Sequence, residues 1–201
     1  MKISGLTSEI KKLAQGRERT LIALVGPPGA GKSTLAEPLA TALGPRAQVV
    51  PMDGFHRDND WLDARDLRAR KGSPETFDVE SFVALVRALK TGAVTEYPLF
   101  DRTSDSVAQG AGHLRDDADI VIVEGNYLLL NHDGWRDLHP LWDASIMLNV
   151  DADILRGRLV QRWIDHGFSP KDAMAKAREN DLKNAGTVIC ESIRATYIVP
   201  N

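Results

Sequence analysis

Apolar residues in this chain occur in short unbroken runs, which are separated by longer segments with helical spacing. The unbroken runs are rich in Val, Ile and Leu, a pattern typical of strands that are buried on both faces of a parallel sheet. They predict strands over residues 20–25, 47–52, 119–125, 144–150 and 196–199. Val94–Phe100 contains Pro98, and we therefore expect an edge or irregular strand there.

Segments with apolar residues three and four positions apart predict helices between these strands. They cover residues 5–15, 33–43, 79–90, 154–166 and 170 to about 183. The residues expected at helix termini are Thr7 or Ser8, Asp78 and Asp151 at the beginnings and Gly44, Gly92 and Gly167 at the ends. A polar excursion is expected through residues Gly110–His113. Strands that alternate with helices predict an α/β fold with a mainly parallel sheet.

Composition narrows the class of protein further. The 201 residues contain no repeat or linker, and they suffice for one domain with a substantial core. A net charge of −3 argues against nucleic acid as the main partner. Cys190 is the only cysteine, so an internal disulfide is excluded and a reducing compartment is favoured. Without a signal-peptide core or an apolar run of membrane-spanning length, we expect a cytoplasmic protein.

Residues Gly26–Thr34 match the pattern G-x-x-x-x-G-K-[ST], in which a glycine-rich turn wraps the phosphates of a nucleotide. A predicted strand precedes this segment and a predicted helix follows it. This order places backbone N–H groups and the positive end of a helix dipole at one point. A chance glycine turn is the alternative, but every signature position is filled and both flanks agree. The motif therefore predicts that the chain binds a nucleoside triphosphate.

The residues of this loop have different expected roles. Pro27 and Pro28 have no N–H, so the amides that follow them are expected to donate to phosphate. Lys32 is expected to reach the β- and γ-phosphates and act in catalysis, and the hydroxyl of Ser33 to bind Mg²⁺. The predicted nucleotide-binding residues are Gly26, Gly29, Ala30, Gly31, Lys32, Ser33 and Thr34.

Two carboxylates follow predicted strands, at the edge where parallel sheets bind ligands. Glu124 is at the position where P-loop proteins place an acidic residue near Mg²⁺. Asp53 is a candidate for the base that orients and deprotonates an acceptor hydroxyl. The alternatives are a turn-forming Asp before Gly54 and a solvated strand end at Glu124.

Three segments resemble the superfamily of phosphoribulokinase, uridine kinase and bacterial pantothenate kinase. They are Pro51–His56, Arg70–Asp78 and Val123–Leu129, and the similarity extends over about residues 20 to 199. Within the superfamily the chain looks most like bacterial proteins provisionally named fructose-transport-system kinases. The resemblance implies a three-layer P-loop kinase core with strand order 2-3-1-4-5 and a small helical lid.

The resemblance also implies an organisation and a set of roles. A single kinase domain would span residues 1–201, with the lid at approximately 153–170 and an acceptor-binding segment at approximately 54–105. ATP and Mg²⁺ would be the cofactors, with Asp53 as the catalytic base. Ser33, Asp53 and Glu124 would be the residues near the metal. Homodimers and larger assemblies are common in the superfamily, so a homodimer is one expectation.

Arginines in the predicted helix 154–166 are candidates for the lid. Guanidinium groups stabilise the charge of a transferring phosphoryl group, and a closing lid excludes water. Arg158 and Arg162 share one helix face, whereas Arg156 and Arg158 do not, so the first pair is predicted to act in catalysis. A solvated helix face is the alternative.

The acceptor-binding residues are predicted to be His56, Arg57 and Arg102, of which His56 follows the same strand as Asp53. No Asn-Lys-x-Asp guanine clamp occurs in the sequence, which argues against a GTP switch. The predicted function is an ATP-dependent kinase that phosphorylates a hydroxyl of a small metabolite such as a nucleoside, a sugar or a pantothenate-like compound. The alternative is a regulatory module that binds and slowly hydrolyses ATP without a small acceptor.

Overall fold

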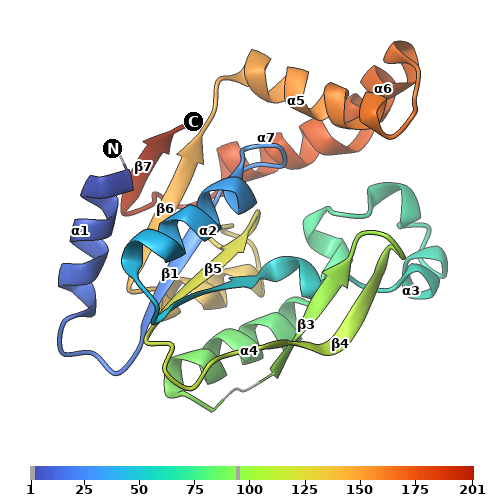
Figure 1. Cartoon of the computed structure of the whole chain (residues 1–201). Helices are drawn as coiled ribbons and strands as arrows, with labels where there is room; N and C mark the ends of the chain where they lie inside the picture. Colours follow the sequence, from blue (N-terminus) through green and yellow to red (C-terminus); the bar gives the residue numbers. More distant parts are fainter. Residues whose placement is uncertain (1–2, 94–95) are drawn as a thin grey trace.

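A five-stranded parallel sheet forms the centre of the protein, in a computed structural model that describes residues 3–93 and 96–201 (Figure 1). Its strands, in the spatial order β2-β5-β1-β6-β7, are β2 (Ala47–Pro51), β5 (Ile120–Gly125), β1 (Thr20–Val25), β6 (Ala144–Asn149) and β7 (Tyr197–Pro200). When these strands alone are numbered along the chain, the order becomes 2-3-1-4-5. The predicted order and fold class are therefore confirmed.

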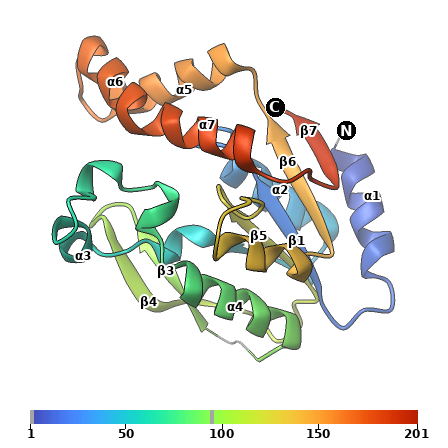
Figure 2. The ribbon, with the colours of Figure 1, turned by 180° about the vertical axis from the view of Figure 1, so that it is seen from behind.

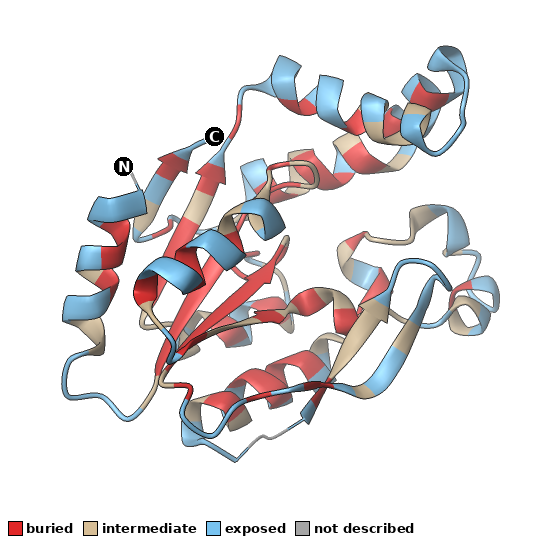
Figure 3. Cartoon of the chain, in the orientation of Figure 1, coloured by how far each residue is buried: buried red, intermediate tan, exposed pale blue. Residues whose placement is uncertain are grey.

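Helices cover both faces of this sheet and bury two apolar clusters (Figures 1 and 2). Strand β1 shows the division, because Leu21, Ala23 and Val25 pack in one cluster whereas Ile22 and Leu24 pack in the other. This alternation follows from the two-residue period of a strand. Figure 3 shows the central strands almost entirely buried, as expected for strands covered on both faces. The result is a three-layer α/β architecture.

The helices on one face are α1 (Ile3–Ala14) and α2 (Lys32–Leu43), and α4 (Val79–Thr91) packs on the other. The C-terminal part contains α5 (Ala152–Asp165), α6 (Pro170–Lys176), a π-helical segment (Ala177–Asp181) and α7 (Leu182–Glu191). Short helices lie at Met52–Phe55, Asn59–Asp63 (α3), Arg68–Arg70, Pro74–Thr76 and Trp135–Leu141. No helix of the described residues is long and apolar enough to span a membrane.

The helix termini agree with the sequence at most positions. Asp78 accepts a hydrogen bond from the backbone N–H of Ser81 at the start of α4. Asp151 accepts from the backbone N–H groups of Asp153 and Ile154 at the start of α5, so both predicted caps are confirmed. The predicted cap of the first helix is wrong, because Thr7 and Ser8 lie inside α1 and donate their hydroxyls to the carbonyl of Ser4. The last helical stretch continues to Glu191, beyond the predicted end near Lys183.

A two-stranded antiparallel hairpin stands apart from the main sheet, formed by β3 (Glu96–Asp101) and β4 (Ser106–His113). The irregular strand predicted from residue 94 corresponds to β3, although residues 94 and 95 lie outside the described residues. The prediction of a polar excursion at residues 110–113 is wrong, because these residues form the last part of strand β4. A Cβ on Gly112 would lie 2.2 Å from the ring of Tyr97, so this glycine lets the buried tyrosine pack across the hairpin.

Candidate functional site

A cavity of about 600 Å³ opens at the carboxyl ends of the central strands and is lined by residues from distant parts of the chain. The residues after β1 form the glycine-rich loop, those after β2 supply Asp53, and β5 supplies Glu124. Side chains of α5 and α6 line the opposite wall, and Figure 1 shows these helices projecting past the strand ends. The fold thus brings the two predicted carboxylates and the predicted phosphate loop to one space.

The glycine-rich loop has the backbone geometry that its sequence predicts. Gly29 and Gly31 have φ angles of 78° and 85°, in the left-handed region that favours glycine. Helix α2 begins directly after Gly31, so its first-turn amides face the cavity end of the loop. The amide of Ala30 instead donates to the carbonyl of Pro27 at 3.0 Å. Gly26 and Ala30 therefore shape the loop from behind, since neither lines the cavity.

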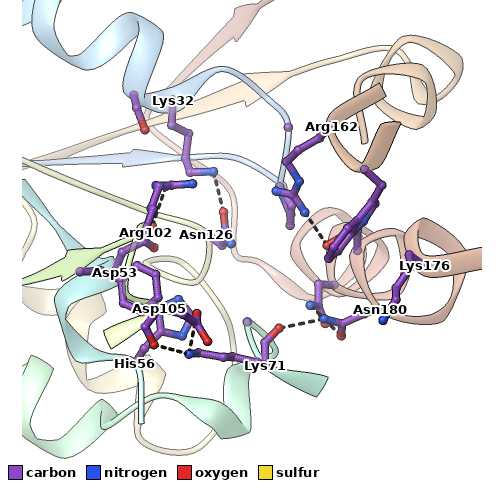
Figure 4. Close-up of a pocket in the computed structure, with 18 of the residues that line it drawn as sticks. Lys32, Asp53, His56, Lys71, Arg102, Asp105, Asn126, Arg162, Lys176 and Asn180 are labelled. Carbon is purple, nitrogen blue, oxygen red and sulfur yellow. Dashed lines mark hydrogen bonds and ion pairs between the residues drawn. The ribbon is translucent and has the colours of Figure 1, made fainter. Parts of the chain in front are cut away.

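Lys32 lies at the centre of the phosphate half of the cavity. Its ammonium donates hydrogen bonds to the carbonyls of Gly26 and Pro27, at 2.9 and 3.2 Å, and to the side-chain oxygen of Asn126 at 2.5 Å (Figure 4). Burial lowers the pKa of Lys32 to about 8, against the opposing effect of the carboxylates of Glu124 and Asp53. A bound anion at this position would favour the charged form of the lysine.

The oxygen atoms of Ser33 and Glu124 are adjacent, with 3.2 Å between the hydroxyl and the carboxylate. Burial raises the pKa of Glu124, and the charge of Lys32 opposes this effect. The described residues include no group of three or more His, Cys, Asp or Glu side chains placed to hold a metal ion. Hard oxygen ligands that leave room for phosphates and water are the kind that Mg²⁺ prefers, so this pair fits that ion.

Asp53 lies in the short helix that follows β2 and faces the same cavity. The guanidinium of Arg102, from the turn of the β3–β4 hairpin, lies 3.1 Å from its carboxylate. Gly54 makes this approach possible, because a Cβ there would be 2.0 Å from the carbonyl oxygen of Pro98. The hairpin therefore packs directly against the turn that carries the candidate base.

His56 lines the cavity next to this pair, with its ring between two phenyl rings. The ring centroids of Phe77 and Phe100 lie 4.1 and 4.9 Å from that of His56. Its Nδ1 atom is buried and has no hydrogen-bond partner among the described residues. Burial lowers the pKa of His56 to about 4, so the imidazole is neutral at physiological pH. A neutral imidazole can accept or donate one hydrogen bond to a hydroxyl.

Besides Gly26 and Ala30, two more of the predicted site residues, Arg57 and Arg158, do not line the cavity. Arg57 forms an ion pair with Asp78 at 3.0 Å and stacks on the ring of Trp61. Arg158 is exposed and donates to the carbonyl of Gly29 at 3.4 Å, on the outside of the loop. Arg162 does line the cavity, and Figure 4 shows it on the side opposite to Lys32.

Lys71 and Asp105, which lie in the predicted acceptor-binding segment 54–105, also line the cavity. The structure adds residues that were not predicted, among them Asn126, Trp163, Lys176 and Asn180. Lys71 donates to Asn59 at 2.8 Å and pairs with Asp105 at 2.8 Å, which ties two loops together. Burial acts to raise the pKa of Asp105, but hydrogen bonds from Lys71 and Asn59 lower it overall. The position of Asn126 could have been predicted from the sequence, because it lies two residues after Glu124 in the segment Val123–Leu129.

Comparison with known proteins places these features in a family. A family model described as an AAA domain matches residues 22–180. An uncharacterized protein of Escherichia coli is 42% identical over 188 residues, which cover 91% of this chain and 78% of that protein. A protein of Schizosaccharomyces pombe that is provisionally named a uridine kinase is 35% identical over 186 residues, covering 86% of this chain and 79% of its own.

A solved structure agrees with this chain over its whole length. The crystal structure of a protein from Silicibacter sp. TM1040, provisionally named a fructose transport system kinase, superposes with a TM-score of 0.96. The two chains are 47% identical, and the match covers 100% of each. The fold of this chain is therefore shared with a protein that carries a kinase name.

Proposed function

The chain belongs to the P-loop kinase superfamily of the uridine and pantothenate kinases, and we propose that it transfers the γ-phosphate of ATP to a hydroxyl group of a small metabolite. The observation that carries the proposal is the continuity of the cavity. One space is lined by Lys32 and Ser33 of the phosphate loop and also by Asp53, His56 and Arg102. Its volume of about 600 Å³ is in the range of sites that bind small molecules.

The residues of the two halves have complementary tasks in such a reaction. Asp53 orients the acceptor hydroxyl and takes its proton as the oxygen attacks the γ-phosphorus in line. Lys32 balances the negative charge of the phosphates, and its position between loop carbonyls and Asn126 fixes its ammonium at the cavity. Arg162 offers guanidinium N–H groups from the opposite wall, where charge is spread over the transferred group.

Ser33, Glu124 and Asp53 would hold Mg²⁺ together with the phosphate oxygens. When bound, the ion supplies positive charge that neutralises the phosphates and orients them. The protein contributes the positions of the oxygen ligands, which come from the start of α2 and the ends of two strands.

We propose that the acceptor is a hydroxyl compound because the residues next to Asp53 suit an uncharged polar group. Neutral His56 and the flanking rings of Phe77 and Phe100 form an uncharged wall next to the candidate base. Names within the superfamily cover unlike acceptors, so membership by itself does not select one.

The test is phosphotransfer with purified protein, ATP and Mg²⁺. ADP release is measured with nucleosides, pantothenate, glycerate and sugars in turn, and the phosphorylated product is identified by mass spectrometry. The proposal expects at least one acceptor to accelerate ADP release above the rate with water alone. If none does and the protein hydrolyses ATP only slowly, an ATP-binding regulatory module becomes the better interpretation.

A further inference from the structure

Asp181 is a buried carboxylate in the lining of the cavity for which the proposed mechanism has no use. It is 6% exposed, and it ends the π-helical segment Ala177–Asp181 that joins α6 to α7. Ionised carboxylates are rarely buried unless they are paired and hydrogen-bonded. Short π-helical turns within helices are frequent at functional sites. The burial of Asp181 therefore requires an explanation in terms of its partners.

Both carboxylate oxygens of Asp181 accept hydrogen bonds from neighbouring residues of α5. The guanidinium of Arg162 donates to Oδ1 at 2.8 Å, and the indole N–H of Trp163 donates to Oδ2 at 2.6 Å. Both of these side chains line the cavity. Asp181 thus links the helix that carries the lid arginine to the segment behind it, and it satisfies two polar groups at once.

The contact leaves most of the guanidinium available. A guanidinium has five N–H donors in a rigid fork, and Asp181 receives a hydrogen bond from one nitrogen of Arg162. The side chain of Arg162 remains 41% exposed, whereas that of Asp181 is 8% exposed. Figure 4 shows Arg162 at the cavity wall with a dashed line on the side away from Lys32. One edge of the fork is held while the rest faces the cavity.

We propose that Asp181 is a positioning residue that holds the guanidinium of Arg162 at the cavity wall, oriented towards the phosphoryl group in transfer. This inference rests on the proposed kinase function. An arginine on a helix has considerable rotamer freedom, and fixing it in advance removes that cost from the reacting complex. The hydrogen bond from Trp163 holds the carboxylate itself in place, so that the arginine is fixed relative to two helices.

A purely structural role for Asp181 is the competing explanation, and the chain provides a matched control. Asp143 is also a buried carboxylate, with a side chain that is 6% exposed, and it pairs with Arg17 at 2.7 Å. It does not line the cavity. Loss of either carboxylate should destabilise the protein to a similar extent, but only Asp181 is expected to affect turnover.

The experiment is a double-mutant cycle. Asp181→Asn keeps an oxygen that can accept from Trp163 but removes the charge that holds Arg162. It is expected to lower kcat roughly tenfold, with the KM for ATP changing less than about twofold. In an Arg162→Met background the same substitution is expected to have no further effect on kcat. Asp143→Asn is expected to leave kcat unchanged, and urea unfolding establishes that each variant is folded.

Three results would each overturn the inference: unchanged kcat in Asp181→Asn, an equal loss of kcat in both backgrounds, or an equal loss of kcat in Asp143→Asn. Absence of phosphotransfer in the wild-type protein would instead refute the proposed function. In that case the cycle is measured on the rate of ATP hydrolysis, in which the phosphoryl group is transferred to water. Coupling between residues 162 and 181 there supports the positioning role, and additivity contradicts it.

Discussion

The guanidinium of Arg102 donates a hydrogen bond of 3.1 Å to the carboxylate of Asp53, a residue 49 positions earlier in the chain. The side chain of Arg102 is 74% exposed, so this pair contributes little to stability. The pair instead fixes a geometry, because the guanidinium from the hairpin restricts the orientation of the Asp53 carboxylate.

Asp53→Asn should abolish most phosphotransfer, because an amide orients a hydroxyl but does not take its proton. We expect kcat to fall by about 10²- to 10⁴-fold while ATP still binds. The measurement is steady-state ADP release with the best acceptor. Asp58→Asn is the control, since Asp58 caps α3 outside the cavity and Asn also caps helices. Full turnover in Asp53→Asn would rule out this residue as the base.

Removal of Mg²⁺ with EDTA should stop phosphotransfer, and Glu124→Gln should raise the Mg²⁺ concentration needed for half-maximal rate. The reason is that an amide is a weaker ligand for a hard cation than a carboxylate. A Mg²⁺ titration of the rate measures the effect, with the exposed Glu37 on α2 changed to Gln as the control. Identical titration curves for Glu124→Gln and the wild type would exclude a role of Glu124 at the metal.

The affinity for ATP should decrease as the pH rises above about 8. The pKa of Lys32 is lowered to about 8 in the ligand-free protein, whereas a bound triphosphate favours its charged form. Binding above this pH therefore requires proton uptake, and we expect roughly tenfold weaker binding at pH 9 than at pH 7. Calorimetry in buffers with different ionisation enthalpies measures both quantities. Lys32→Arg, which stays charged, should lack this dependence.

His56 should make the protein less stable in acid. Its pKa is about 4 in the folded state, below the ordinary value of 6.5, so the unfolded state binds more protons between these values. Stability from this group is therefore present near pH 7 and lost as the pH falls from 6.5 towards 4, by about 2 kcal/mol at pH 5. Urea unfolding should show that His56→Phe removes this loss. His113→Gln, at an exposed histidine, should behave like the wild type.

Gly54→Ala should impair both stability and activity. The added Cβ would lie 2.0 Å from the carbonyl of Pro98, so the hairpin must shift away from the turn that carries Asp53. Overpacking of this kind costs about 1–3 kcal/mol. The control is Gly157→Ala in α5, where a Cβ would contact nothing within 4 Å and the helix should become more stable. Equal stabilities of the two variants in urea would contradict the close approach at Gly54.

The sequence predicts the sheet because strands covered on both faces have unbroken apolar runs. It predicts the phosphate loop because Gly26–Thr34 match a motif with fixed spacing. The β3–β4 hairpin has no unbroken apolar run of this kind. Strand β4 is polar and contains Gly110 and Gly112, and its formation depends on Tyr97, a partner from the other strand. Asp105 lies in the turn of this hairpin and pairs with Lys71, a contact that the sequence does not predict because it depends on the hairpin.

The sequence analysis also predicted two pairs of residues to lie at the site together, His56 with Arg57 and Arg158 with Arg162. In each pair the backbone geometry directs only one side chain to the cavity. His56 pairs in an isolated β-bridge with Phe77, and successive side chains of extended backbone point to opposite sides. Arg57 therefore points away from His56 and meets Asp78. Arg158 and Arg162 share a helix face as expected, but they are about one turn apart along the axis. That distance places only Arg162 at the cavity, with Arg158 outside the loop.

The β3–β4 hairpin shares no strand pairing with the five-stranded sheet over residues 3–93 and 96–201. It contacts β2 through side chains instead, since the hydroxyl of Tyr97 donates to the carbonyl of Val49 at 3.4 Å and Gln48 donates to the carbonyl of His113 at 2.5 Å. The hairpin also packs on Gly54, because the absence of a side chain there leaves space for the backbone at Pro98. A change in the turn of this hairpin, residues 102–105, would therefore alter the wall beside Asp53 while the strand pairing of the main sheet stays the same.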